Sequence, residues 1–182
     1  MIGHVRKIGQ ALRWFGVSEK GVATVEFVIV FPFFVGVFLG SYEVAIMNIR
    51  AVMLERAVDM AVREIRLAGG ADIEHEDVRT FICNRMILIK DCTDVTKIEL
   101  TRVDRDTWTV DLEATPDCQD RLDDIKPPKN FQNGTENDLM LVRVCAVVDT
   151  VFPTFGVGRT IPRDPDGGYI LTSLSAFVNE PA

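Results

Sequence analysis

One long apolar run dominates the first quarter of the chain. Residues 22–39 read VATVEFVIVFPFFVGVFL and contain a single charged side chain, Glu26. About 20 mostly apolar residues suffice for a helix to cross the hydrocarbon core of a bilayer. Pro32 removes one backbone donor and should kink such a helix, but membrane helices tolerate proline. We therefore expect a transmembrane helix over residues 22–42.

The helical pattern continues beyond the apolar run. Apolar residues recur at spacings of three and four, and charged residues such as Glu43 and Arg50 stand elsewhere, as in an amphipathic helix. Gly69-Gly70 supply a flexible stop. The pattern predicts one helix over residues 22–68, of which residues 43–68 lie outside the membrane. The apolar stripe consists of Val44, Met47, Ala51, Leu54, Val58, Ala61, Ile65 and Ala68.

This stripe allows two interpretations. It can pack on the protein's own sheet, or it can form a helical seam with a neighbouring subunit, and both can hold at successive heights along the helix. Self-packing is the expectation for the half from Leu54 to Ile65.

Residues 69–182 have the pattern of a small α+β domain. Asp72 is a candidate N-cap for a short helix over residues 73–85. Alternating apolar residues then predict a strand at Ile98 and Leu100 and another over residues 108–114, joined as a hairpin by a turn at residues 104–106. Residues 115–137 are rich in turn formers and predict a surface loop. Residues 138–151 and 168–178 predict two more strands of an antiparallel sheet.

Charge is distributed unevenly along the chain. Residues 1–20 hold four basic side chains against Glu19, which gives +3, whereas the remainder carries 16 basic and 26 acidic side chains, which gives −10. The basic residues are Arg6, Lys7, Arg13 and Lys20. By the positive-inside bias, the N-terminus is expected in the cytoplasm and the domain outside it. The basic head is either an amphipathic helix on the membrane face or a disordered leader. The acidic body argues against binding to nucleic acid.

Four cysteines follow the apolar run: Cys83, Cys92, Cys118 and Cys145. If the domain is exported, an oxidising compartment favours two disulfides. Of the three possible pairings, we put forward the one that joins Cys83 to Cys92 and Cys118 to Cys145. A metal site is the alternative, but the chain has no C-x-x-C pair and its two histidines, His4 and His75, lie far apart. No metal or other cofactor is expected.

Glu26 is the residue that needs an explanation. A carboxylate at the centre of a membrane helix costs about 2.5–3.5 kcal/mol, and less near an end. Glu26 can remain hydrated at the headgroups. Alternatively, cleavage between Gly21 and Val22 would create an α-amine, and the amine of one subunit could meet the Glu26 carboxylate of another in a bundle of parallel helices. Such a pair would set the register between subunits.

A basic leader ending in Lys20-Gly21, followed by an apolar helix with Glu at its fifth position, resembles the class III signal of type IV pilins and pseudopilins. More narrowly, EKGVATVEFVIVFPFF resembles the TadE-like (TadE/TadG-like) pseudopilins of the tight adherence (Tad/Flp) type IVb pilus system, through Gly21, Glu26, Phe27 and Pro32. The ending AFVNEP, at residues 176–181, is similar to the Asn-Glu-Pro ending of that family. The resemblance implies a pilin-like α+β fold with a long N-terminal helix.

The expected protein is therefore a minor pilin or pseudopilin of the bacterial inner membrane. Residues 1–21 would be a cleaved leader, 22–42 the membrane span, 43–68 its extracytoplasmic continuation and 69–182 a periplasmic domain, which could also enter the extracellular pilus. The resemblance implies as partners a prepilin peptidase, the Flp major pilin, a TadF-like pseudopilin, and the inner-membrane platform and assembly ATPase. No enzymatic activity is expected, because the chain shows no nucleophile and base motif.

Two alternatives stay open. The first is an uncut single-pass anchor whose extracytoplasmic domain binds a partner. The second is a membrane-tethered thiol enzyme, which requires a free cysteine.

Overall fold

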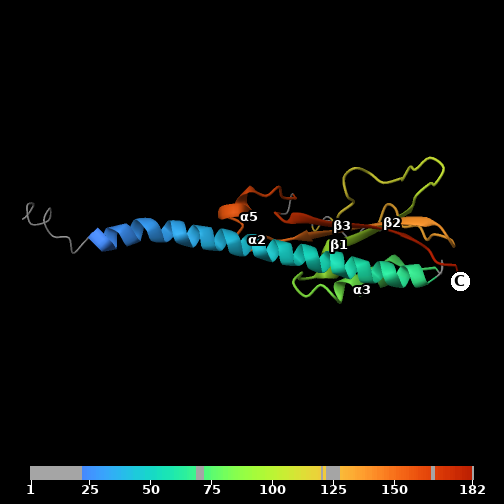
Figure 1. Ribbon diagram of the computed structural model, residues 1–182, viewed down its shortest axis with the longest axis horizontal. Coiled ribbons are helices and arrows are strands. Elements are labelled where there is room, and N and C mark those ends of the chain that lie inside the picture. The colour runs from blue at the N-terminus through green and yellow to red at the C-terminus, as the bar shows by residue number, and fades with distance from the viewer. Residues whose placement is uncertain (1–21, 69–71, 120, 122–127, 165–166, 182) are drawn as a thin grey trace, which may run out of the picture. The chain divides into compact units, whose positions relative to one another are not determined.

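The computed structural model describes residues 22–68, 72–119, 121, 128–164 and 167–181. Its fold is α+β, as predicted (Figure 1). The predicted leader with Gly21, and the predicted stop at Gly69-Gly70, lie outside the described residues. In chain order the elements are α2 (Val22–Leu67), α3 (His75–Cys83), α4 (Cys92–Val95), β1 (Thr96–Arg102), β2 (Leu139–Val148), α5 (Gly156–Thr160) and β3 (Tyr169–Val178).

Helix α2 is 46 residues long and passes through Pro32 without ending. This confirms the helix predicted over residues 22–68, and the C-terminal boundary differs by one residue. The chain divides into two compact units, Met1–Ser41 and Tyr42–Ala182. We refer to the second unit as the domain.

The domain contains a three-stranded antiparallel sheet in the order β1-β2-β3. Val144 is the Cα partner of both Ile98 on β1 and Ser173 on β3, so the even-numbered residues of β1 and β2 share a face with the odd-numbered residues of β3. That face carries the core. The core side chains of the strands include Ile98, Leu100, Met140, Val142, Val144, Ala146, Val148, Tyr169 and Phe177.

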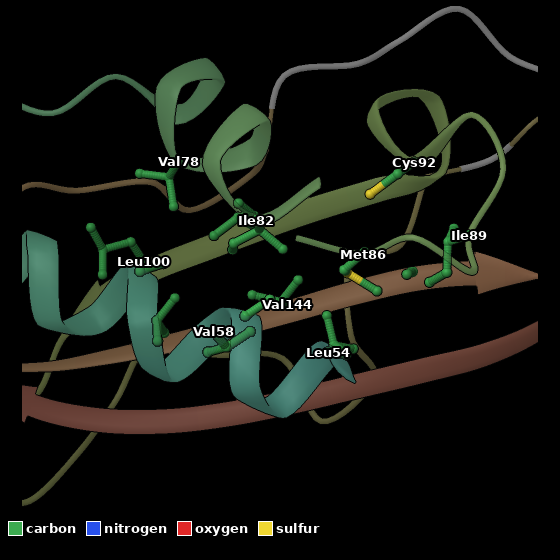
Figure 2. Packing of buried hydrophobic residues seen from close by; sticks show 14 of the residues in the cluster. Leu54, Val58, Val78, Ile82, Met86, Ile89, Cys92, Leu100 and Val144 are labelled. Atoms are coloured by element: carbon green, nitrogen blue, oxygen red, sulfur yellow. The ribbon is translucent and has the colours of Figure 1, made fainter. Parts of the chain in front are cut away.

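The buried stripe of α2 and helix α3 complete the same core (Figure 2). Leu54 and Ala57 are fully buried on α2, and Ile82 is fully buried on α3. Full burial of a side chain as large as Leu or Ile contributes roughly 1.5–3 kcal/mol. The prediction that the helix packs on its own domain between Leu54 and Ile65 is confirmed.

The predicted cap of the short helix is wrong. Helix α3 begins at His75, its N-cap residue is Glu74, and no side chain caps it. The Asp72 carboxylate instead accepts a hydrogen bond of 2.6 Å from the Asn133 amide. The Asp72 side chain therefore binds a residue far away in the sequence and does not cap the helix.

The predicted hairpin is only half correct. The turn forms, because the Asp104 carboxylate accepts hydrogen bonds from the backbone N–H groups of Asp106 and Thr107. Residues 108–114, however, form no strand and make one isolated bridge, Val103↔Val110. The predicted strands over residues 138–151 and 168–178 are confirmed as β2 and β3, each with ends inside the predicted range.

Another segment of the chain occupies the outer edge of β1, and this explains why the predicted strand does not form. Leu100 donates its N–H to the Asn130 carbonyl and accepts from the N–H of Gln132, at 2.9 and 2.8 Å. The loop after residue 115 therefore occupies the edge that residues 108–114 would have needed for pairing.

Candidate functional site

The first part of α2 presents an apolar surface without a covering of its own. Among the described residues, one helix is long and apolar enough to cross a membrane, and it is α2. Exposed apolar area of this extent is unusual in a water-soluble monomer and suits contact with lipid. The exposed large side chains of this part are Val25, Phe27, Val28, Ile29, Val30, Phe31, Phe33, Phe34, Val37 and Phe38.

The predicted assembly residues lie on this surface. Glu26 is exposed, and the described part of the chain offers its carboxylate no hydrogen bond or ion pair. It stands four residues after Val22, the first residue of α2, and therefore about one helical turn further along. The Phe27 ring stacks on Phe31, with the ring centroids 4.9 Å apart. An acid that its own chain leaves without a partner is available to a neighbour.

Glu43 is a residue that sequence reasoning placed wrongly. It was assigned to the charged side of the helix, but it is only 1% exposed. Its two carboxylate oxygens accept the backbone N–H groups of Val151 and Phe152 at 3.0 and 2.8 Å. Its spacing contained the signal, because positions 43, 47, 50, 54 and 58 follow the three-and-four step of the buried stripe.

A second buried charge network lies on the other face of the sheet. Glu99 and Arg143 face each other across β1 and β2 and form an ion pair of 2.6 Å, in which both side chains are less than a tenth exposed. Arg143 also donates to the backbone carbonyl of Glu113 at 2.7 Å. Lys97 pairs with Asp117 at 2.9 Å nearby. Because buried ions need partners, this network holds residues 113–117 against the sheet.

All four cysteines are paired. The disulfides are Cys83–Cys92 and Cys118–Cys145, which is the pairing put forward from the sequence. The first connects α3 to α4, and the second connects the long loop to β2. None of the four thiols is free in the structure.

A cavity of about 550 Å³ lies between the segment after α3 and the end of β2. Arg50, Arg121 and Asp149 are among its lining residues. Arg121 pairs with the Asp149 carboxylate at 2.8 Å, and Arg50 donates to the Asp149 carbonyl at 2.7 Å. These charged groups serve the fold itself, so we assign the cavity no ligand.

An apolar helix that is long enough to cross a membrane and continues into a disulfide-linked α+β domain is consistent with a single-pass membrane anchor. Residues 21–63 match the TadE-like protein family. The match confirms the resemblance predicted from Gly21, Glu26, Phe27 and Pro32, all of which lie inside it. No curated protein and no solved structure matches the chain.

Proposed function

We propose that the chain is a minor pilin or pseudopilin, which a prepilin peptidase cuts between Gly21 and Val22 and which takes part in assembling a Tad/Flp-type pilus for surface adhesion. The observation that carries the proposal is a lone carboxylate, Glu26, on the exposed apolar part of α2, inside the segment that matches the TadE-like family. That match already associates the chain with the Tad pilus system.

The physical role of Glu26 follows from its cost. A carboxylate inside a membrane is tolerated when it has a partner, and the described chain gives it none. The α-amine that cleavage creates at Val22 is a cation and can therefore pair with the Glu26 carboxylate. In a bundle of parallel helices that are shifted along their axes, the amine of one subunit reaches the carboxylate of another. Their attraction is strong where water is excluded, so the pair sets the stagger between subunits.

The basic leader keeps the N-terminus in the cytoplasm and places the domain in the periplasm, from which it can enter the extracellular pilus. In this position the chain meets the prepilin peptidase, the Flp major pilin, a TadF-like pseudopilin, and the platform and assembly ATPase of the inner membrane. Its role is structural rather than enzymatic, and it needs no cofactor. In support, the four thiols are paired and the Nε2 of His75 accepts a backbone N–H.

N-terminal sequencing of the protein from membranes tests the proposal. Val22 as the first residue is expected in the parent, and Met1 is expected in Gly21→Ala. Glu26→Gln should leave the cut unchanged but reduce the number of pili per cell, because the amide keeps the shape and loses the charge. Glu55→Gln, at an exposed position of the same helix, is the matched control.

Two results would contradict the proposal. Intact Met1 in cells that make working pili favours the uncut anchor with a partner-binding domain. Normal piliation in Glu26→Gln removes the electrostatic role of the carboxylate.

A further inference from the structure

We infer that residues 151–163, the interface loop, form a second membrane contact in which Phe155 and Val157 enter the lipid headgroup region. The inference rests on the proposed span of residues 22–42. It assigns the interface loop, which includes α5, to a lipid surface rather than to a protein partner.

The attachment of the loop determines its level relative to the membrane. Tyr42 is the last residue of the proposed span, and Glu43 is the first residue after it. A helix of the length of this span rises about 30 Å, which matches the hydrocarbon core, so Tyr42 reaches the interface. Glu43 binds the N–H groups of Val151 and Phe152, and the Tyr42 and Phe152 ring centroids are 6.1 Å apart. The interface loop therefore begins where the helix leaves the bilayer.

The position of α5 within the domain agrees with this attachment. In Figure 1, α5 lies beyond the strands, at the end of the domain away from the C-terminus. The interface loop therefore lies at the end of the domain that contains Tyr42 and Glu43 (Figure 1).

The loop is compactly built. The Arg163 guanidinium donates to the carbonyls of Pro153 and Gly158, which draws the two ends of the loop together. A Cβ at Gly158 would lie 2.5 Å from the Phe152 carbonyl oxygen, so the chain closes on itself only with glycine there. This compact turn leaves Phe155 47% exposed and Val157 37% exposed.

Charge favours a lipid surface. Residues 150–163 contain Arg159 and Arg163 and no acidic residue, in a body whose net charge after residue 20 is −10. Arg159 is exposed, four residues after Phe155 and two after Val157. Arginines extend to phosphate headgroups while neighbouring aromatic and aliphatic side chains occupy the interface, and this combination is typical of interfacial membrane contacts.

Depth measurement on the full chain tests the inference. A nitroxide is attached to Phe155→Cys in vesicles of phosphatidylethanolamine and phosphatidylglycerol, and its accessibility to oxygen and to a water-soluble nickel chelate is measured. The label should lie about 5–10 Å inside the headgroup and acyl boundary. Leu174→Cys, at a position of β3 that is 59% exposed, is the matched control and should report water. Adding Arg159→Glu should move the 155 label toward water, whereas Arg56→Glu, at an exposed position of α2, should not.

Three outcomes would overturn the inference. The first is a 155 label as accessible to nickel as the 174 label. The second is a 155 label shielded from both oxygen and nickel, because this is the pattern of a contact with a neighbouring subunit. The third is a label at Val30→Cys that reports water, which means that the span itself has failed. A Val30 label in lipid with a 155 label in water leaves the anchor intact and removes only the loop contact.

Discussion

At the residue scale, buried charged side chains fix the positions of loops in the domain by binding their backbone groups. Glu43 holds the start of the interface loop through two backbone N–H groups. Arg143, paired with Glu99, holds residues 113–115 by donating to the backbone carbonyls of Glu113 and Thr115. A buried charge is stable only when it is hydrogen-bonded, and here its hydrogen-bond partners are backbone N–H and C=O groups of the loops. Loops that are not hydrogen-bonded into the β-sheet thereby acquire defined positions.

His75 gives the domain a dependence on pH. Burial lowers the pKa of its imidazole, and the nearby Arg79 and Lys97 lower it further, against an opposing effect of Glu76. The neutral ring accepts the Ile98 N–H at Nε2 over 3.3 Å. Because the folded pKa lies below the unfolded value of about 6.5, this contribution to stability is complete above that pH and is lost as the pH falls toward the folded pKa.

We therefore expect the urea midpoint of unfolding to fall between about pH 7.5 and pH 5.5, and to fall less in His75→Gln, which keeps an acceptor but does not titrate. In protein that retains residues 1–21, His4→Gln is the control for the other histidine. Asp138 does not interfere in this window. Burial raises the pKa of its carboxyl, but hydrogen bonds from Thr135 and the nearby Arg102 and Arg105 bring it below the ordinary value. Equal pH dependence in the parent and His75→Gln would show that another group is responsible.

At the element scale, one helix serves two environments. The part of α2 before Ser41 exposes its large apolar side chains, whereas Leu54, Ala57, Val58 and Ala61 are buried in the core of the domain. Beyond Tyr42 the helix also exposes Val44, Ile49 and Val52. The remaining secondary structure is short, so links between elements determine much of the stability of the domain.

The two disulfides should contribute unequally. The sequence separation is 9 for Cys83–Cys92 and 27 for Cys118–Cys145, and loop-closure entropy predicts about 2.7 and about 3.6 kcal/mol respectively. We expect Cys118→Ala/Cys145→Ala to lower the free energy of unfolding of the full chain in detergent more than Cys83→Ala/Cys92→Ala. Urea titrations under non-reducing conditions measure both. The reverse order would mean that strain or residual structure outweighs loop length.

At the scale of the whole molecule, orientation in the membrane links the leader to the disulfides. The four basic residues of the leader favour a cytoplasmic N-terminus, and only an exported domain meets an oxidising compartment. In the proposed orientation, charge at one end of the chain would therefore control disulfide formation at the other.

Reversing three leader charges, in Arg6→Glu/Lys7→Glu/Arg13→Glu, should retain part of the domain in the cytoplasm with free thiols. A gel shift with a polyethylene glycol maleimide, without reductant, counts the thiols per chain. The triple variant Arg6→Lys/Lys7→Arg/Arg13→Lys preserves the charges and should remain fully oxidised. Full oxidation of the reversed variant as well would show that the leader does not set orientation.

The sequence by itself determined the elements whose signals are local. The apolar run, the three-and-four spacing of α2 and the strands β2 and β3 were predicted, because hydrophobic periodicity reflects which face of an element is buried. The cysteine pairing was a choice among three, which the fold decided by bringing Cys118 to Cys145. Helices α4 and α5 were not predicted, since runs of four and five residues carry little periodic signal.

Only the tertiary structure decided which of several possible hydrogen-bond partners a residue or a strand edge binds. Residues 108–114 have a strand pattern, but Asn130 and Gln132 occupy the edge of β1. Asp72 has the chemistry of a cap, but Asn133 binds it. Glu43 is charged, yet it is buried because the N–H groups of Val151 and Phe152 come to it from more than a hundred residues away. In each case the contact that forms joins distant parts of the chain, and the local pattern, even where its spacing indicates burial as at Glu43, does not identify the partner.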